Sequence, residues 1–218
     1  MPENKTDLLR EALSGKIVLV TGGGSGIGAA IAESFGLHGA KVGVHYYRSD
    51  VQAVSALVEK IRTAGGEAFS LQADFSSSPA VAATIEQTVA HFGGLDILVN
   101  NAGIFEQGSV LDTTLPAFTR TMDINVTGVF LGMKSVAPHM VNRGKGSIVN
   151  ISSVAGLNGT PGFLAYGATK WAVRGMTKGV AKELAPFGVR VNSIHPGIID
   201  TPMLQTFDAA GEGVREAV

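Results

Sequence analysis

The 218-residue sequence contains no cysteine, which excludes disulfide bonds, thiolate nucleophiles and cysteine-ligated zinc. Its five histidines show no spacing typical of metal ligands, so we expect no metal site. Net charge is almost absent, at −1, and the chain therefore has no broad attraction for nucleic acid or for an anionic membrane. These absences indicate small molecules or other subunits as partners.

Long apolar runs are missing as well. No run approaches the roughly 20 residues that span a bilayer, and the polar segment 1–16 does not resemble a secretory signal. We therefore expect a cytoplasmic protein with no membrane association. Hydrophobic residues make up 45% of the chain and charged residues only 16%, which is typical of a compact globule and not of a disordered chain. We predict a single domain over residues 1–218.

Six short apolar runs rich in β-branched residues recur along the chain, each followed by a stretch with helical spacing. Runs that are apolar throughout are typical of strands covered on both faces. The pattern predicts an α/β fold, in which a doubly wound parallel sheet lies between helices. The predicted strands are 16–21, 41–47, 67–73, 95–100, 146–152 and 189–195, and the predicted helices are 26–38, 50–64, 78–92, 126–143 and 163–185.

Some helix ends are visible in the sequence. Ser78 before Pro79 suits an N-cap followed by proline at the first helical position. Gly39, Gly65 and Gly93 suit C-terminal stops, because glycine readily adopts the left-handed conformation that ends a helix. The predicted helices around 50–64 and 78–92 are therefore bounded at their C-terminal ends.

The segment 21–28, with the sequence TGGGSGIG, follows the first predicted strand and opens the first predicted helix. At such a turn, free N–H groups and the helix dipole face a phosphate, and glycines let the backbone approach a pyrophosphate closely. The usual dinucleotide fingerprint fits only loosely, as Gly24-x-Gly26-x-x-Ala29. The alternative is a turn that merely reverses the chain, but its place between strand and helix favours cofactor binding.

Tyr166 and Lys170 lie four residues apart and so share one face of a predicted helix. A free tyrosine titrates near pH ~10, and a nearby ammonium lowers the pKa of a phenol. Ser153, thirteen residues before Tyr166, could hold a substrate oxygen beside this general acid/base. The alternative is an ordinary amphipathic helix with a solvated lysine. Ser152 is a rival for the serine role, but adjacent strand residues point opposite ways.

From about Lys16 to about Met203, the chain resembles the short-chain dehydrogenase/reductase family. The resemblance rests on several motifs in the family's order: the glycine turn, Asn100-Asn101-Ala102-Gly103, the segment DINV at 123–126, the serine, tyrosine and lysine above, and Pro196-Gly197 followed by Thr201. It implies a Rossmann-type sheet with strand order 3-2-1-4-5-6 and ligands at the carboxyl ends of the strands. The family's seventh strand, which usually follows the segment matching 205–218, is expected to be missing.

The resemblance implies an NAD(P)-dependent oxidoreductase that transfers a hydride between nicotinamide and a carbonyl or secondary alcohol. Tyr166 then acts as general acid/base, and Ser153 binds the same substrate oxygen. Lys170 lowers the pKa of Tyr166 and holds the nicotinamide ribose, while Asn125 fixes a water that continues the proton path. The alternative is a catalytically silent cofactor-binding module used in regulation or interaction, because fold alone does not establish activity.

The cofactor-binding residues that the resemblance implies follow the strand ends. They are Thr21, Gly22, Ser25, Gly26, Ile27, Gly28, Tyr46, Arg48, Asp74, Phe75, Asn101, Ala102, Gly103, Tyr166, Lys170, Pro196, Gly197, Ile199 and Thr201. Two of them have a structural alternative. Asp74 matches a position that contacts the adenine region, but an aspartate there can also cap a turn. Asn101 can equally serve to bind neighbouring strands.

The end of the second strand bears on the choice of nicotinamide cofactor. Tyr46 stands where NAD-preferring relatives place a carboxylate, and Arg48 lies just beyond it. Because arginine suits bidentate phosphate binding, we predict a preference for NADP, or dual use, over strict NAD. Arg48 could instead be a solvated loop charge, and Asp50 could bind the ribose if the loop shifts.

The substrate is a small ketone or alcohol whose identity the sequence leaves open. The residues expected to line its pocket mix apolar and polar groups, without singling out a sugar, a steroid, an acyl thioester or a simple ketone. They are Ile104, Phe105, Glu106, Val154, Asn158, Phe163 and Met203. The family also implies a homo-oligomer, a dimer or a tetramer.

Overall fold

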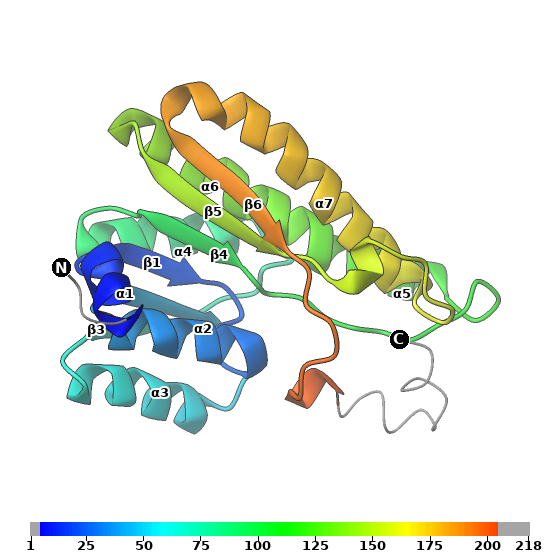
Figure 1. Ribbon diagram of the computed structural model, residues 1–218. Coiled ribbons are helices and arrows are strands. Elements are labelled where there is room, and N and C mark those ends of the chain that lie inside the picture. Colours follow the sequence, from blue (N-terminus) through cyan, green and yellow to red (C-terminus); the bar gives the residue numbers. More distant parts are fainter. Residues whose placement is uncertain (1–4, 205–218) are drawn as a thin grey trace.

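A computed structural model describes residues 5–204, in which six parallel strands form one sheet (Figure 1). The strand order β3-β2-β1-β4-β5-β6 confirms the prediction, and each strand is one or two residues shorter than expected. The expectation about the segment 205–218 lies outside the described residues. The strands are β1 (Ile17–Val20), β2 (Lys41–Tyr46), β3 (Glu67–Gln72), β4 (Ile97–Asn100), β5 (Gly146–Ile151) and β6 (Val189–Ile194).

The five predicted helices are present as α2 (Gly26–Leu37), α3 (Val51–Thr63), α4 (Ser78–Phe92), α6 (Gly128–Arg143) and α7 (Leu164–Leu184). The sequence analysis missed α1 (Lys5–Leu13) and α5 (Leu115–Met122). A π-helical segment, η1 (Asp123–Thr127), joins α5 to α6, so that the helix expected from residue 126 is part of a much longer helical run. Short 3-10 helices, η2 (Val154–Gly156) and η3 (Ala185–Phe187), lie on either side of α7.

Helices pack on both faces of the sheet, and each face has its own hydrophobic core. Val18 and Val20 of β1 point into a core with α2 and α3, whereas Ile17 and Leu19 point into a core with α4, α6 and α7. Because successive side chains of a strand alternate between the faces, a fully buried strand such as β1 must be apolar throughout. The arrangement is that of a doubly wound sheet.

The two edge strands are less covered than predicted. Within the described residues, β3 exposes Glu67 and Gln72, and β6 exposes Arg190, Asn192 and Ile194. Both strands therefore alternate between buried and exposed residues, because each has one strand neighbour and one well-covered face. The expectation that all six strands are buried on both faces is wrong for these two.

The glycine stops are confirmed, and the capping assignments need one correction. Gly39, Gly65 and Gly93 have φ values of 85°, 87° and 84°, in the left-handed region that glycine adopts without strain. The N-cap of α4 is Ser77 and not Ser78, since helical geometry begins one residue earlier than predicted. At α3, the carboxylate of Asp50 accepts a hydrogen bond of 2.8 Å from the backbone N–H of Gln52 and so caps this helix.

A buried chain of polar side chains links the middle of the sheet to α7. Asn100 of β4 and Asn150 of β5 are paired in the strand register, and Asn100 Nδ2 donates to Asn150 Oδ1 at 2.9 Å. Asn150 Nδ2 donates in turn to the hydroxyl of Thr177 at 2.9 Å. These groups are almost inaccessible to solvent, so their mutual hydrogen bonds replace those lost to water.

Candidate active site

The predicted site residues lie where the strands end at their carboxyl edge. The glycine turn follows β1, residues 101–106 follow β4, Ser153 follows β5, and residues 195–201 follow β6. Tyr166 and Lys170 reach the same edge from the first turns of α7. A topological switch occurs there, since β1 leads to β2 on one side and β3 leads back to β4 on the other side of β1, and this is the usual ligand crevice of such sheets.

The glycine turn needs its glycines for both conformation and space. Gly22 and Gly26 have φ values of 63° and 51°, and a Cβ atom on Gly22 would lie 2.8 Å from the Cα atom of Ala102. A Cβ atom on Gly28 would meet the carbonyl oxygen of Gly22 at 2.2 Å. Ser25, the N-cap of α2, makes no side-chain capping bond. The turn therefore presents an open helix N-terminus with closely packed backbone around it.

Thr21 and Asn101 join this turn to the chain after β4. The Thr21 hydroxyl accepts hydrogen bonds from the N–H groups of Asn101 and Ala102, each at 3.0 Å. Asn101 Nδ2 donates to the carbonyl oxygens of Thr21 and Gly22, at 3.0 and 3.1 Å. The side-chain amide of Asn101 thus serves the structural role that the sequence left as its alternative.

His45 is a residue of this region that the sequence analysis passed over. Its Nε2 donates to the Ala73 carbonyl at 3.0 Å, and its Nδ1 accepts from the Gly22 N–H at 3.1 Å. The ring also lies 3.9 Å from that of Phe75, centre to centre. Burial lowers the pKa of His45 to about 4, so the ring is neutral and joins the phosphate turn to the end of β3. The signal in the sequence that could have identified His45 is a histidine near the end of a largely apolar strand.

Ser153, Tyr166 and Lys170 are brought together as predicted. The side chains of Ser153 and Tyr166 are hydrogen-bonded, and the Ser153 oxygen also accepts from the Ala155 N–H at 3.1 Å. Ser152 points elsewhere, with its hydroxyl donating to the Lys170 carbonyl at 2.9 Å. The structure thus favours Ser153 over Ser152, because only Ser153 contacts the phenol.

The direction of the Tyr166 pKa shift differs from the prediction. Lys170 is fully buried, and its Nζ donates to the carbonyl oxygen of Ile151 at 2.9 Å while lying 5.3 Å from the centre of the Tyr166 ring. Burial lowers the pKa of Lys170 to about 8. Burial also raises the pKa of Tyr166 above 10.0, and the hydrogen bond from Ser153 offsets this only in part. The predicted lowering of the Tyr166 pKa by Lys170 is therefore wrong for this structure.

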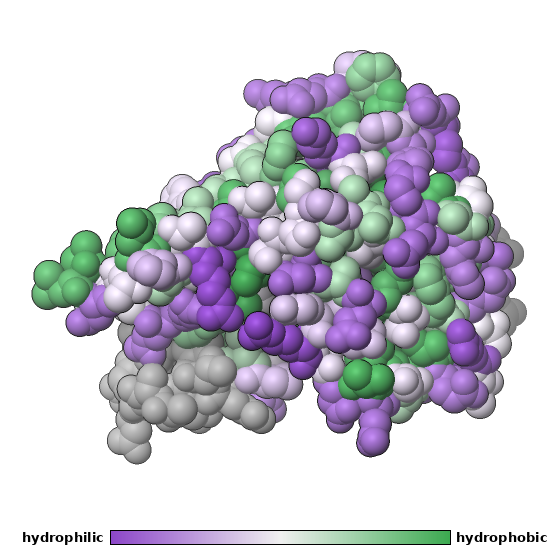
Figure 2. Space-filling view, turned by 180° about the vertical axis from the view of Figure 1, so that it is seen from behind, coloured by the Kyte–Doolittle hydropathy of each residue, from purple (hydrophilic) through white to green (hydrophobic). Residues whose placement is uncertain are grey.

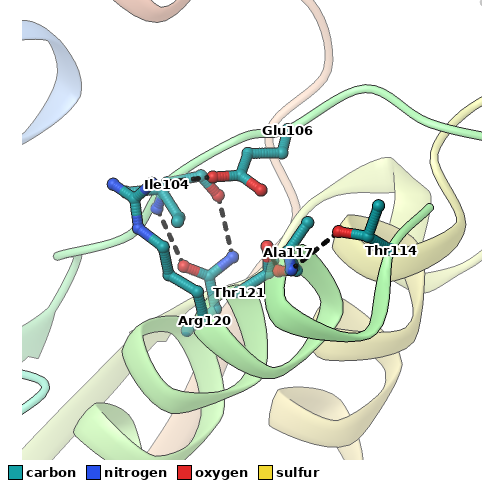
Figure 3. A network of polar contacts seen from close by, with 7 residues as sticks. Ile104, Glu106, Thr114, Ala117, Arg120 and Thr121 are labelled. Carbon is teal, nitrogen blue, oxygen red and sulfur yellow. Dashed lines mark hydrogen bonds and ion pairs between the residues drawn. The ribbon is translucent and has the colours of Figure 1, made fainter.

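Asn125 lies inside the π-helical segment and ties three elements together. Its Oδ1 accepts from the Ile104 N–H, and its Nδ2 donates to the Ile104 carbonyl, both at 2.8 Å. Nδ2 also lies 3.3 Å from the hydroxyl of Thr169 on α7. Figure 3 shows this corner, where Arg120 of α5 reaches across Ile104 to an ion pair of 3.2 Å with Glu106. The chain after β4 is thus held by α5 and η1, and η1 is in turn bonded to α7.

A cavity of about 680 Å³ opens between the ends of β2 and β3 and the helix α5. Its wall includes Tyr47, Arg48, Asp74, Ser76, Ile104, Leu115, Pro116, Thr119, Arg120, Asp123 and Ile124. Among the predicted cofactor residues, Arg48 and Asp74 line it, whereas Tyr46 and Phe75 are buried in the protein. The carboxylate of Asp50 caps α3, which argues against the alternative that Asp50 binds a ribose.

Asp74 caps a turn, as its structural alternative in the sequence suggested, and it also lines the cavity. Its carboxylate accepts from the N–H and the hydroxyl of Ser76, at 2.9 and 2.7 Å, and so caps the turn after β3. These bonds lower its pKa, with smaller contributions from Tyr47 and Arg48. Arg48 itself lies over the ring of Tyr47, 5.0 Å from its centre. A carboxylate and a guanidinium thus face the same cavity.

The loop after β6 closes the site on the other side. Pro196 accepts a hydrogen bond of 3.0 Å from the Val154 N–H, next to Ser153. A Cβ atom on Gly26 would lie 3.3 Å from the Cβ of Thr201, so this loop reaches the glycine turn. Gly197 and Ile199 between them are exposed. The loop thus runs from the segment beside Ser153 to the glycine turn.

Aromatic rings line the chain beside the phenol. The ring of Phe105 lies 4.9 Å from that of Phe163 and 5.1 Å from that of Tyr166, with edge-to-face geometry in both pairs. Glu106, next to Phe105, is turned to Arg120 instead. Val154 is half-buried and Asn158 is exposed on the loop after Ser153, while Met203 lies on the loop after β6. Of the predicted substrate-pocket residues, Phe105 and Phe163 thus lie against the ring of Tyr166.

Two absences concern the described residues, 5–204. None of the helices described there is long and apolar enough to cross a membrane. The same residues contain no group of three histidine, aspartate or glutamate side chains arranged to hold a metal ion.

Comparison with known proteins gives consistent matches. A family model described as short chain dehydrogenase matches residues 16–211. The 3-alpha-(or 20-beta)-hydroxysteroid dehydrogenase of Mycobacterium tuberculosis is 44% identical over 193 residues, or 88% of this chain and 72% of that protein. The cyclopentanol dehydrogenase of a Comamonas species is 43% identical over 202 residues, or 92% and 79%. A crystal structure of a short chain dehydrogenase from Burkholderia cenocepacia in complex with NADP has a TM-score of 0.83 and 40% identity, covering 88% of this chain and 77% of that one.

Proposed function

The chain belongs to the short-chain dehydrogenase family, and on that premise we propose which of its residues carry out the family's chemistry and on which class of substrate. It is an NAD(P)-dependent oxidoreductase that acts on hydroxyl and carbonyl groups. The hydrogen-bonded pair of Ser153 and Tyr166, with the buried ammonium of Lys170 beside it, is the observation that carries the residue assignment.

The glycine turn fits the pyrophosphate of a dinucleotide. Side chains are excluded from Gly22 and Gly28 by backbone contacts, the helix α2 begins there without a side-chain cap, and the cavity next to it is large enough for an adenosine. Thr21, Ser25, Gly26, Ile27, Asn101, Ala102 and Gly103 surround this turn and belong to the proposed binding site. When bound, the nicotinamide supplies or accepts the hydride.

Tyr166 is the proposed general acid/base. In reduction its hydroxyl donates a proton to the substrate oxygen as negative charge develops there, and in oxidation the phenolate takes that proton back. The raised pKa of Tyr166 keeps the phenol protonated at neutral pH, which suits it as the acid for reduction. The Ser153 oxygen accepts from the Ala155 N–H, so its own O–H is left to donate to the substrate oxygen or the phenol.

Lys170 and Asn125 complete the proposed set. An ammonium has three N–H donors, and the carbonyl of Ile151 takes one of those of Lys170, so two remain for ribose hydroxyls or water. The side-chain amide of Asn125 is bonded to Ile104 and Thr169, which holds η1 in place beside α7. We propose that Asn125, fixed in this way, holds the water through which a proton reaches Lys170.

NADP is the preferred cofactor in this proposal. Arg48 is exposed at the mouth of the cavity, at the end of β2, and its guanidinium is kept there by stacking on Tyr47. A guanidinium in that position attracts the 2′-phosphate that distinguishes NADP from NAD. The related structure from Burkholderia cenocepacia, which contains NADP, supports this choice.

We propose alicyclic ketones and secondary alcohols as the substrate class. The edge-to-face rings of Phe105 and Phe163 extend an apolar wall from the Tyr166 phenol, and such a wall suits the flat face of a saturated ring. The hydroxysteroid and cyclopentanol dehydrogenases that the chain resembles are named for cyclic alcohols, which supports the same class.

The test is a turnover assay with NADPH and NADH over a panel of cyclic ketones, linear ketones, sugars and acyl thioesters, followed by nicotinamide absorbance. We expect cyclic ketones to give the highest kcat/KM. Tyr166→Phe should lower kcat by a factor of about 10²–10⁴ while leaving NADPH binding intact. Near-normal turnover by Tyr166→Phe would reject the acid/base assignment, and cofactor binding without turnover on any substrate would favour a silent module.

Self-association and location complete the proposal. The loop before α5 projects at one edge of the molecule (Figure 1), and hydrophobic side chains gather at the corresponding edge in the turned view of Figure 2. Val110, Leu111 and Leu115 there are 74%, 92% and 76% exposed, which supports burial against another subunit. We propose a single-domain, cytoplasmic homo-oligomer, and sedimentation together with cell fractionation would test it.

A further inference from the structure

The peptide unit between Ser153 and Val154 is held on both sides by the loop after β6. The carbonyl oxygen of Ser153 lies 3.0 Å from Nδ1 of His195. The N–H of Val154 donates to the carbonyl oxygen of Pro196, also at 3.0 Å. Both polar atoms of this one peptide unit are therefore bonded to two consecutive residues of another segment. Such a pair of bonds fixes the position of the peptide as well as its rotation.

The hydrogen-bond partners of His195 define its tautomer. A carbonyl oxygen only accepts, so Nδ1 of His195 must carry the hydrogen that bonds Ser153. In the neutral ring Nε2 is then an acceptor, and it lies 3.0 Å from the hydroxyl oxygen of Ser193, which donates to it. Ser193 of β6 thus fixes the ring at Nε2, and the ring in turn fixes the Ser153 carbonyl through Nδ1.

We propose that His195 is a positioning residue for Ser153, which sets the place of the serine hydroxyl relative to the Tyr166 phenol. This inference rests on the catalytic role proposed for Ser153. The serine side chain is hydrogen-bonded to Tyr166, so a shift of its backbone changes the geometry around the substrate oxygen directly. A misplacement of about 1 Å in such a group can lower the rate by about 10²-fold. The ring nitrogens of His195 are bonded to Ser193 and to the Ser153 carbonyl, so His195 acts through the Ser153 backbone.

Two substitutions of His195 distinguish the contribution of Nδ1 from that of Nε2. The amide nitrogen of His195→Asn can take the place of Nδ1 and donate to the Ser153 carbonyl. The longer side chain of His195→Gln places its amide near Nε2 and loses that bond. We expect His195→Gln to lower kcat about 10- to 100-fold with the KM for NADPH unchanged, and His195→Asn to restore most of the rate. Equal rates for the two variants would overturn the proposal.

Controls distinguish positioning from stability. His139→Gln changes a histidine that pairs with Glu86 on the outer helices, and its kcat should equal that of the unchanged protein. Thermal unfolding of each variant, followed by circular dichroism, shows whether it folds. Should His195→Gln fail to fold, Ser193→Ala replaces it, because loss of the Ser193 hydroxyl releases Nε2; we then expect a smaller fall in kcat, of about threefold to tenfold.

A double-mutant cycle tests the route through Ser153. In a Ser153→Ala background, His195→Gln should have almost no further effect on kcat, because the hydroxyl that it positions is absent. Fully additive effects would overturn the proposal. The proposed function is tested separately in the same cycle, since normal turnover by Ser153→Ala alone would reject the catalytic role of Ser153 whatever the histidine variants do.

Discussion

Lys170 places its ammonium 5.3 Å from the centre of the Tyr166 ring and gives a 2.9 Å hydrogen bond to the Ile151 carbonyl. The two side chains are neighbours along one helix face, as their spacing requires. The ammonium is nevertheless directed to a backbone carbonyl at the end of β5, and burial controls the pKa values of both groups. Burial therefore shifts both equilibria toward the neutral forms, although Lys170, with a pKa of about 8, still carries its proton at pH 7.

The first prediction concerns the stability cost of Lys170. Its pKa falls from 10.5 to about 8 on folding, so the charged form is disfavoured in the folded protein by about 3 kcal/mol below pH 8. This cost declines as pH rises from 8 to 10.5, where the unfolded chain also loses its proton. Lys170→Met removes the charge but also a hydrogen bond worth about 1 kcal/mol. We expect turnover to be lost while the free energy of unfolding at pH 7 stays equal or rises by about 1–2 kcal/mol.

Urea unfolding at pH 7 and pH 10 measures this effect, with Lys178→Met, an exposed lysine of the same helix, as the matched control. The difference between Lys170→Met and the unchanged protein should shrink at the higher pH. A clear loss of stability in Lys170→Met at pH 7 would contradict the argument.

The second prediction concerns the ionisation of Tyr166 in the free protein. Because burial raises its pKa above 10.0, the phenol should remain protonated throughout the neutral range. Ultraviolet titration of phenolate absorbance, compared between the unchanged protein and Tyr166→Phe, isolates this group. Tyr47→Phe, which removes an exposed phenol, is the control variant for this titration. A phenolate appearing near pH 7 in the free protein would show that the ammonium outweighs burial.

The third prediction concerns acid stability and His45. Its pKa falls from 6.5 to about 4 on folding, so between these values the unfolded chain binds a proton that the folded protein does not. The stabilisation is complete above pH 6.5 and is lost as pH falls toward 4, by up to about 3 kcal/mol. His45→Asn does not titrate there, and its amide oxygen can still accept from the Gly22 N–H.

Denaturant unfolding between pH 7 and pH 4 should therefore give a shallower slope for His45→Asn than for the unchanged protein. His38→Asn, which alters a histidine bonded to the Ser34 carbonyl on the outer surface, serves as the control. Parallel curves for His45→Asn and the unchanged protein would contradict the assignment.

The fourth prediction concerns Arg48 and cofactor preference. Loss of a charge-assisted hydrogen bond to the 2′-phosphate should cost about 1.5–3 kcal/mol. Arg48→Ala should then lower kcat/KM for NADPH about 10- to 100-fold and change that for NADH by less than about threefold. Arg10→Ala, an exposed arginine of α1, is the control for net charge. A strong preference of the unchanged protein for NADH would refute the role of Arg48.

The residue patterns were sufficient to predict the sheet, and the family resemblance implied the order of its strands. All six strands and five helices were predicted, because buried parallel strands are apolar throughout and helices end at glycines such as Gly39 and Gly65. The helix α5 was missed although its signals were present: Thr114 caps it, accepting from the Ala117 N–H at 3.3 Å, and Pro116 lies in its first turn.

Tertiary contacts explain what the sequence could not show. Helical spacing brings Lys170 beside Tyr166 but does not reveal that a carbonyl of β5 takes the ammonium. The π-helical turn at Asn125 depends on a fit to Ile104, which is distant in the chain. Tyr46 was predicted at the ribose but is buried, because its side chain belongs to the hydrophobic core that β2 forms with α2 and α3.

The hydrogen bond between Asn100 and Asn150 has a consequence for the site above it. A slip of β4 against β5 by one residue would place the two amides on opposite faces of the sheet and break the hydrogen bond between them, so that Asn100 would lose its partner in an apolar core. Aliphatic residues at both positions would tolerate that slip, and with it a change of about one residue in the relative height of Asn101 and Ser153. The amide pair thus fixes the register of β4 against β5, and with it the relative heights of Asn101 and Ser153 above the sheet.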